Sequence, residues 1–231
     1  MAHIHFIGGE KGGVGKSMLS RVLAQYFIDK EIPFLGFDTD RSHGALLRFY
    51  ADYASPMIVD KYENLDAMVE QSLDKPDQRV LVDLAAQTHD ALSRWMEESG
   101  VPEVAAEIGL KLTYWHVMDC GKDSVDLLGK LLARFGSKLN YVLVLNQLRG
   151  ETFEIFDASE AKERALAADA KVITLKRLHE TSVNKIDAAS TSFWAASHRT
   201  ESNVKVLGVL EQQRVKVWLE NAYAQIDTIG V

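Results

Sequence analysis

The feature that most constrains the fold is a glycine-rich segment, Gly-Gly-Val-Gly-Lys-Ser, at residues 12–17. It follows an apolar, strand-like run, Ile4 to Ile7, and precedes a helix-like stretch, Met18 to Lys30. Glycines let consecutive backbone N–H groups turn inward onto an anion, and the dipole of the following helix adds positive potential at the same place. The order of strand, glycine-rich turn and helix therefore predicts a phosphate-binding loop.

Two side chains of this loop carry chemistry. Lys16 is expected to place its charge on the β- and γ-phosphates of a nucleotide, and Ser17 to offer its hydroxyl to Mg²⁺. The usual pattern has glycine where this chain has Glu10, and a lysine, Lys11, follows it. The residues expected to hold the nucleotide are Gly12, Gly13, Val14, Gly15, Lys16, Ser17 and Met18.

The string from Lys11 to Ser17 resembles the deviant Walker A motif, KGGxGK[ST], of the ParA and MinD family of P-loop ATPases. In that family the lysine that corresponds to Lys11 contacts the nucleotide of the neighbouring subunit in a face-to-face dimer. The resemblance implies that the chain binds ATP with Mg²⁺, forms a homodimer on ATP binding, and uses Lys11 and Lys16 in catalysis. The alternative is a glycine-rich hairpin with an accidental match, which the strand and helix on either side disfavour.

Apolar, partly β-branched runs recur along the chain with helical segments between them, as expected for buried parallel strands. A helix is predicted over 123–135, ending before Gly136, and a closing helix over 201–227 that packs through apolar residues including Leu207, Leu210 and Val217. We therefore expect one α/β domain over residues 1–231, a P-loop NTPase with a mostly parallel, twisted sheet and helices on both faces. The predicted strands cover 4–7, 33–37, 80–84, 112–118, 141–145 and 172–175.

The second predicted strand ends in Asp38-Thr39-Asp40, which is similar to the DxD of the same family. The resemblance implies that Asp40 holds the attacking water and that Asp38 supports the magnesium shell or Lys16. The alternative is that both aspartates only cap a loop. The proline and glutamine usual after this motif are replaced by Arg41 and Ser42.

Two further strand ends offer site residues. The run from Arg79 to Asp83 has the form of a Walker B strand, so Asp83 is expected to reach Mg²⁺ through water; alanines follow where many P-loop enzymes have glycine. Thr88 is expected to cap the next helix. Asn146 ends the fifth strand, where the family commonly has an asparagine that contacts adenine, although a turn-forming role is the alternative.

The charge of the chain is unevenly distributed. The formal net charge is −7, yet eight basic residues stand against four acidic ones between Lys171 and Lys216, which leaves −11 on the remainder. The net charge argues against a nucleic-acid contact over the whole surface, whereas this region could contact DNA or be an ordinary solvated helix surface.

The single cysteine, Cys120, excludes an internal disulfide framework and a cysteine-rich metal site. Neither a signal peptide nor an apolar run long enough to cross a bilayer is present in this sequence, so we expect a cytoplasmic protein. His3 and His5 alternate with Ile4 along a strand and so share one face, where a hydrogen-bonded or exposed pair is favoured over a metal site.

Metal-cluster carriers of this family need cysteines that bridge a dimer, so Cys120 alone excludes that class. The best match is an ATP-driven switch that positions or partitions a cargo, with a protein partner that stimulates hydrolysis. Within this group the chain resembles the TraL-type proteins of conjugative plasmids. The alternatives are a metabolic ligase of the dethiobiotin or cobyrinate synthetase type and a nucleotide-binding module without turnover.

Overall fold

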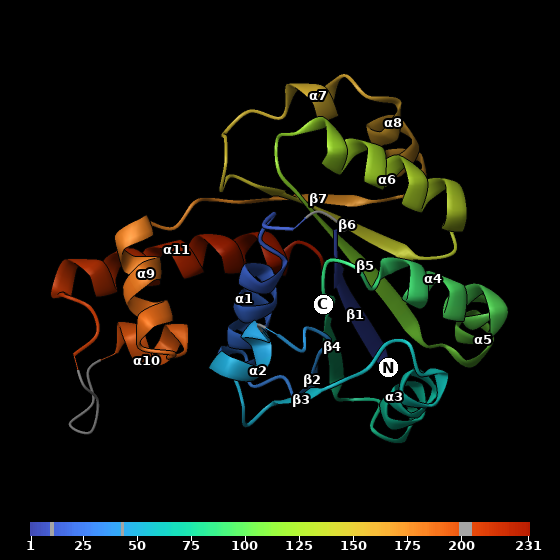
Figure 1. The fold of residues 1–231 in the computed structure, drawn as a ribbon, viewed down its shortest axis with the longest axis horizontal. Helices are drawn as coiled ribbons and strands as arrows, with labels where there is room; N and C mark the ends of the chain where they lie inside the picture. Colours follow the sequence, from blue (N-terminus) through green and yellow to red (C-terminus); the bar gives the residue numbers. More distant parts are fainter. Residues whose placement is uncertain (10–11, 43, 199–204) are drawn as a thin grey trace.

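A computed structural model describes residues 1–9, 12–42, 44–198 and 205–231. Its centre is a twisted sheet in which every pairing of neighbouring strands is parallel (Figure 1). The strands are β1 (His3–Gly8), β2 (Phe34–Asp38), β3 (Ala54–Pro56), β4 (Arg79–Asp83), β5 (Lys111–Met118), β6 (Asn140–Asn146) and β7 (Lys171–Leu175). The α/β class and all six predicted strands are confirmed.

Strand β3 was not expected from the sequence. It is three residues long, pairs with β2 at the edge of the sheet, and contains two exposed residues, Ser55 and Pro56. So short a run has no hydrophobic period, and proline is tolerated there because an edge strand need not donate a hydrogen bond on its outer side.

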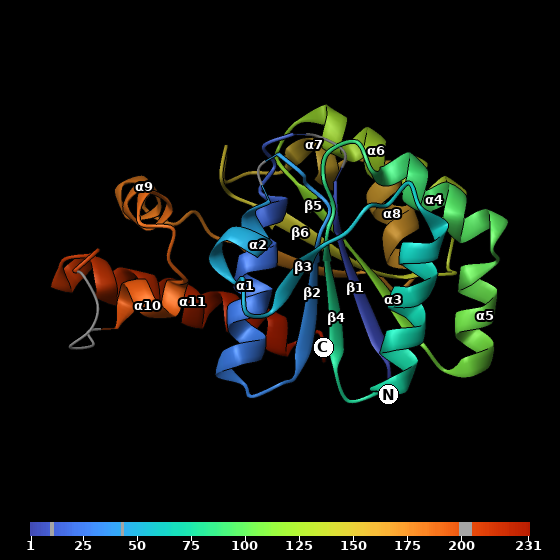
Figure 2. The ribbon, with the colours of Figure 1, turned by 60° about the horizontal axis from the view of Figure 1, so that its bottom comes forward.

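Helices cover both faces of the sheet, as expected (Figures 1 and 2). Alternate residues of β1 point to opposite faces: Ile4 and Phe6 pack beneath helices α3 to α8, whereas Ile7 packs beneath α1, α2 and α11. The helices are α1 (Lys16–Asp29), α2 (Ala45–Phe49), α3 (Tyr62–Asp74), α4 (His89–Glu98), α5 (Val101–Ile108), α6 (Lys122–Phe135), α7 (Glu154–Asp157), α8 (Glu160–Ala167), α9 (Glu180–Ala188), α10 (Phe193–Ser197) and α11 (Val209–Asp227).

The strand order, β3-β2-β4-β1-β5-β6-β7, places the phosphate loop at the middle of the sheet. Strand β1 pairs with β4 on one side and with β5 on the other. Strands β2 to β4 lie on one side of β1 and β5 to β7 on the other, so the strand order reverses at β1. Asp38 of β2 is in register with Asp83 of β4, one strand from the loop. Ligands of open α/β sheets bind outside the carboxyl ends of the strands at such a reversal, so the expected site residues lie where a ligand would.

Two of the predicted helices can be compared with the structure directly. Helix α6 (Lys122–Phe135) agrees with the expected range and ends at Gly136. The closing helix was predicted to begin at residue 201, but α11 begins at Val209 and residues 205–208 are not helical. The backbone N–H of Gly208 donates to the Glu211 carboxylate at 2.7 Å, and this cap fixes the start of the helix.

Helices α9, α10 and the first half of α11, up to Trp218, project to one side of the sheet (Figures 1 and 2). We call this projection the arm. Trp194 of α10 and Leu210 of α11 are exposed on it, at 43% and 73%. The prediction that Leu210 and Val217 supply buried apolar area is wrong, because both side chains face solvent.

Among the described residues, we find no helix that combines the length and the apolar character needed to cross a lipid bilayer.

Candidate nucleotide-binding site

In the described part of the loop between β1 and α1, glycines adopt conformations that suit the predicted phosphate cradle. Gly15 stands immediately before α1 with a left-handed φ of 99°. A Cβ added to it would lie 2.0 Å from Nδ2 of Asn146, so only glycine fits. Gly12, Gly13 and the residues 15–18 line a cavity of about 280 Å³ together with the loop that follows β4. Lys11 lies outside the described residues.

Val14 differs from the other loop residues. Its side chain is 1% exposed and packs in the core with Leu19 and Val117, away from the cavity. Any contact of Val14 with a nucleotide would therefore come from its backbone.

Lys16, the first residue of α1, is buried to 8% exposure in the wall of this cavity. Burial lowers the pKa of its ammonium group, and the carboxylates of Asp83 and Asp40 oppose that shift. A partly desolvated cation beside two carboxylates exerts a strong field, because little water screens it. This arrangement suits a ligand with several negative charges.

Asp83 ends β4 on the floor of the same cavity, at 3% exposure. Burial raises the pKa of its carboxyl to about 7, and the negative charge of Asp38 adds to the shift; Ser20, Ser17 and Lys16 oppose it. Within the described part of the chain, its buried Oδ1 has no hydrogen-bond partner. An unsatisfied carboxylate oxygen in a polar cavity fits a hydrated divalent cation.

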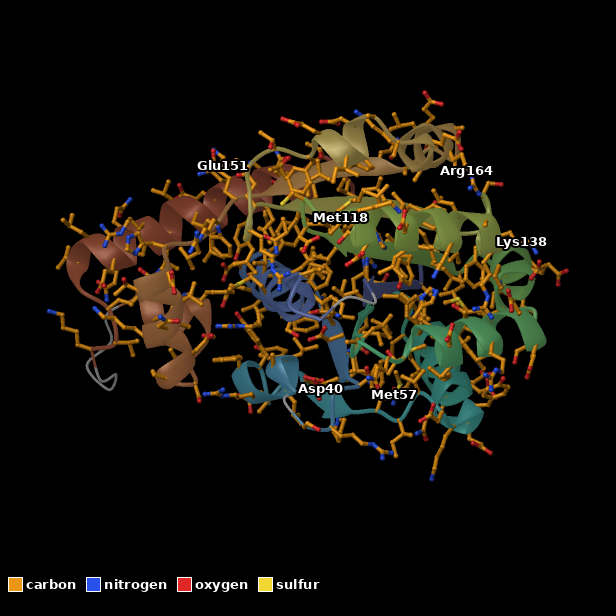
Figure 3. The ribbon with its side chains drawn as sticks, turned by 45° about the horizontal axis from the view of Figure 1, so that its top comes forward. Asp40, Met57, Met118, Lys138, Glu151 and Arg164 are labelled. Carbon is orange, nitrogen blue, oxygen red and sulfur yellow. The ribbon has the colours of Figure 1, made fainter. Side chains whose placement is uncertain are left out.

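Asp38 and Asp40 have different surroundings. Asp38 is buried, and its two carboxylate oxygens accept the backbone N–H groups of Asp40 and Leu47, both at 3.0 Å. Asp40 lines the phosphate cavity, and its Oδ1 accepts the N–H of Ser42 at 2.9 Å. Figure 3 shows Asp40 near Met57, with which it lines a second cavity of about 460 Å³. Asp38 thus shapes the loop, whereas Asp40 faces the space beside Lys16.

Asn146 lies at the end of β6 beneath the phosphate loop. Its Nδ2 donates to the carbonyl of Val14 at 2.7 Å, and the residue is 4% exposed. It also lines a mainly apolar cavity of about 250 Å³ next to Met18. The structure therefore gives Asn146 a support role for the loop in addition to its place at a cavity that could hold a base.

Sequence reasoning missed several residues around these cavities. Leu178 and Trp218 line the cavity beside Asn146, although they are far from the loop in the sequence. Arg149 reaches the loop as well: one of its guanidinium nitrogens lies 2.9 Å from the place of a Cβ on Gly13, and it pairs with Asp119 at 3.3 Å. The only sequence signal for Arg149 was its position three residues beyond Asn146.

The described residues contain no group of three or more His, Cys, Asp or Glu side chains placed to hold a metal ion. His3 and His5 are both buried, with ring centroids 3.8 Å apart and ring planes tilted by 38°. Thr88 does precede α4, but its hydroxyl donates to the Ala85 carbonyl instead of accepting an N–H group of the helix.

Comparison with known proteins gives two kinds of similarity, and no family model matches the chain. In sequence, the chain is 26% identical to protein TraL of Escherichia coli over 245 residues, which covers all of both chains. In structure, it resembles the MinD cell division protein of Aquifex aeolicus with a TM-score of 0.53 at 14% identity, covering 94% of this chain and 97% of that one.

A nucleotide-binding protein of Archaeoglobus fulgidus in complex with ADP gives a TM-score of 0.50 at 14% identity, covering 82% and 86% of the two chains. These structural similarities show the fold. Together with the TraL relationship, they confirm the resemblance that the loop motif indicated.

Proposed function

We propose that this chain, which is related to TraL along its whole length and is similar in fold to MinD, is an ATP-dependent switch that binds and slowly hydrolyses Mg-ATP. In this proposal two copies form a homodimer around ATP, and hydrolysis in response to a protein partner dissolves it. The switch positions or partitions a cargo during plasmid maintenance or conjugal transfer. The observation that carries the proposal is that buried Lys16 and buried Asp83 line one cavity with the glycine loop, and that Oδ1 of Asp83 has no hydrogen-bond partner among the described residues.

The phosphates would occupy the cavity of about 280 Å³ beneath the loop. Backbone N–H groups of residues 12–17 and the ammonium of Lys16 would bind their oxygens. The hydroxyl of Ser17 and, through water, the carboxylate of Asp83 would hold Mg²⁺, with Asp38 supporting this shell from behind. A bound Mg²⁺ supplies charge neutralisation between the phosphates.

Asp40 is the residue that we propose to orient the attacking water. Its carboxylate faces the cavity and is held by the N–H of Ser42, so its position is restrained before any ligand binds. Lys11, by analogy with the family, would complete the pocket of the neighbouring subunit.

The base would enter the apolar cavity beside Asn146. This cavity shares Met18 with the phosphate cavity, so a nucleotide could span both. The indole of Trp218 and the side chain of Leu178 offer apolar area to a purine. The indole N–H of Trp218 donates to the Lys176 carbonyl at 2.6 Å, and this bond holds the ring in place.

DNA contact through the region from Lys171 to Lys216 is part of the proposal. Three basic residues of this region lie on or next to the arm and form no ion pair with another described residue: Lys205, Arg214 and Lys216. By contrast, Lys185 is neutralised by Glu211 at 2.7 Å. The affinity of such a contact would fall steeply with added salt.

Calorimetric titration with ATP and ADP in magnesium buffer tests the proposal. The chain should bind both nucleotides, and Lys16→Ala should weaken binding by roughly two orders of magnitude because the phosphates lose a desolvated cation. Lys130→Ala, which removes a basic residue outside both nucleotide cavities, is the control and should bind ATP and ADP like the parent.

Phosphate release and product analysis separate the alternatives. Binding without phosphate release would reduce the protein to a nucleotide-binding module, and rapid conversion of a small carboxylic acid would favour a ligase. A parent chain that binds neither nucleotide would contradict the proposal.

A further inference from the structure

The middle residue of the Asp38-Thr39-Asp40 segment makes contacts that its position in the motif did not suggest. The Thr39 hydroxyl donates to the Asp83 carbonyl at 3.0 Å and accepts the N–H of Ala85 at 2.8 Å. The backbone N–H of Thr39 also donates to the Asp83 carbonyl, at 3.1 Å. One side chain and its own amide thus make three hydrogen bonds across the gap between two loops.

These bonds lie in a protected place. Thr39 is 7% exposed, and the register of β2 and β4 ends at the pair Asp38 and Asp83, one residue earlier. The threonine therefore continues the attachment of the two strands beyond the end of the sheet. This buried hydroxyl donates once and accepts once, and its loss would leave the Ala85 amide without that partner.

The two loops that Thr39 joins form one side of the phosphate cavity. Asp40 contributes from the end of β2, and residues 83–86 contribute from the end of β4, whereas Thr39 itself does not line the cavity. We propose that Thr39 is a positioning residue that ties these loops together, so that Asp40 and the loop after Asp83 meet the terminal phosphate as one rigid unit. This inference rests on the proposed function, because Asp40 is there assigned to the attacking water.

The arrangement also explains how a loop without glycine can be held in place. The segment Leu84-Ala85-Ala86 has alanine where many P-loop enzymes have glycine. With the Ala85 amide bonded to Thr39, the loop is fixed by the neighbouring strand end. Loss of the Thr39 hydroxyl should therefore lower the affinity for ligands that reach the loop after Asp83 and leave the affinity for shorter ligands unchanged.

The test compares Thr39→Val, which keeps the branched shape and removes the hydroxyl, with Thr39→Ser, which keeps the hydroxyl. Affinities for ADP and for a non-hydrolysable ATP analogue are measured by calorimetry in magnesium buffer. Amide hydrogen exchange over residues 84–88 is followed in the nucleotide-free protein. Thr113→Val is the matched control, since Thr113 is a buried threonine whose hydroxyl bonds to His3 at 2.8 Å, away from the site.

We expect Thr39→Val to keep ADP affinity within about twofold and to lose roughly tenfold in affinity for the ATP analogue, as the loss of one or two net hydrogen bonds implies. Exchange over residues 84–88 should rise in Thr39→Val. Both readouts should return to the parent values in Thr39→Ser, and Thr113→Val should keep the parent ratio of the two affinities.

An unchanged affinity ratio in Thr39→Val, or an equal loss for both nucleotides, would overturn the inference while leaving the proposed function intact. A parent chain that binds neither nucleotide would overturn the proposed function, and the role of Thr39 toward a terminal phosphate with it.

Discussion

Among the described residues, His3, His5 and His116 are buried in the central sheet, where burial favours the neutral imidazole. Burial lowers the pKa of His3 to about 3 and that of His116 to about 4, and it lowers the pKa of His5 well below the ordinary value. The charges of Lys111 and Arg79 lower the pKa values of His3 and His5 further. His5 is fixed by the indole N–H of Trp115, which donates to its Nδ1 at 3.1 Å.

These histidines should make the folded state sensitive to acid. Below pH 6.5 the unfolded chain binds protons on them and the folded chain does not, so the free energy of unfolding falls as the pH falls. At pH 5 each buried histidine accounts for up to about 2 kcal/mol of that loss. Urea unfolding between pH 7.5 and pH 5 measures it.

The matched variants for this experiment are His5→Gln, which keeps a polar side chain that does not titrate, and His179→Gln, at an exposed histidine. His5→Gln should flatten the pH dependence, and His179→Gln should follow the parent. If the stability of His5→Gln fell as steeply as that of the parent, the explanation from burial would be wrong.

Asp40 is the residue on which turnover should depend. We expect Asp40→Asn to lower the rate of phosphate release by about 100-fold or more and to keep ATP affinity within about threefold, because replacing an acceptor oxygen by a donor NH₂ group disturbs the orientation of the attacking water. Phosphate release under saturating ATP measures the rate. Asp52→Asn, at an exposed aspartate between α2 and β3, is the control. Equal rates in the parent and Asp40→Asn would remove Asp40 from the mechanism.

The sequence predicted the site unevenly, and the reason lies in the range of the contacts. Lys16, Ser17 and Asp83 follow directly from local motifs, in which the loop and the strand end dictate where the side chains go. Trp218 lines the base cavity from a helix some 70 residues after Asn146. No spacing rule connects such residues, because only the packing of α11 brings them together.

At the scale of elements, Arg21 ties the phosphate-loop helix α1 to the arm. Its guanidinium, from a residue only 4% exposed, donates to Asp187 of α9 at 2.8 Å and lies 3.7 Å from the ring centre of Phe49 and 4.8 Å from that of Phe193. Arg48 of α2 donates to the Asp187 carbonyl at 2.6 Å. Two helices that flank the site thus hold the same part of the arm.

Gln25 makes a second connection one turn further along α1. Its Oε1 accepts the hydroxyl of Tyr50 and the backbone N–H of Trp194, both at 3.1 Å. Because Gln25 is 1% exposed, these bonds are shielded from water, and α1, the end of α2 and α10 form one polar junction inside the apolar core.

Removing the guanidinium should therefore cost stability. Arg21→Met is expected to lower the free energy of unfolding by about 2 kcal/mol, since Asp187 loses its buried partner but keeps access to water. Arg177→Met, which breaks an exposed pair with Glu180, is the control and should cost less than about 1 kcal/mol. Urea unfolding at pH 7 measures both, and equal losses would argue against a special role of the junction.

The elements themselves were largely predictable. Each of the six predicted strands is a nearly continuous apolar run, as a strand covered by helices on both faces must be. The start of α11 was mispredicted because Leu207 was counted among the apolar residues of the closing helix, whereas the structure buries it in the loop before Gly208. An apolar residue in a buried loop cannot be distinguished from a helical one by periodicity alone.

At the scale of the whole molecule, the proposed assembly makes a prediction about mass. Light scattering after gel filtration should give twice the mass of the chain with a non-hydrolysable ATP analogue and magnesium, and the mass of one chain with ADP. Lys11→Ala should keep nucleotide affinity within about threefold but stay at the mass of one chain, since its ammonium is assigned to the opposite subunit. A dimer of Lys11→Ala with the analogue would contradict that assignment.

The junction at Arg21 and Gln25 has a thermodynamic consequence for any ligand that would bind the arm. Both residues belong to the helix that begins with Lys16, so a displacement of the arm strains the helix whose first turn surrounds the phosphates. Linkage between two binding events is reciprocal. A cargo that binds the arm more tightly when the nucleotide is bound must, by the same factor, raise the affinity of the protein for that nucleotide.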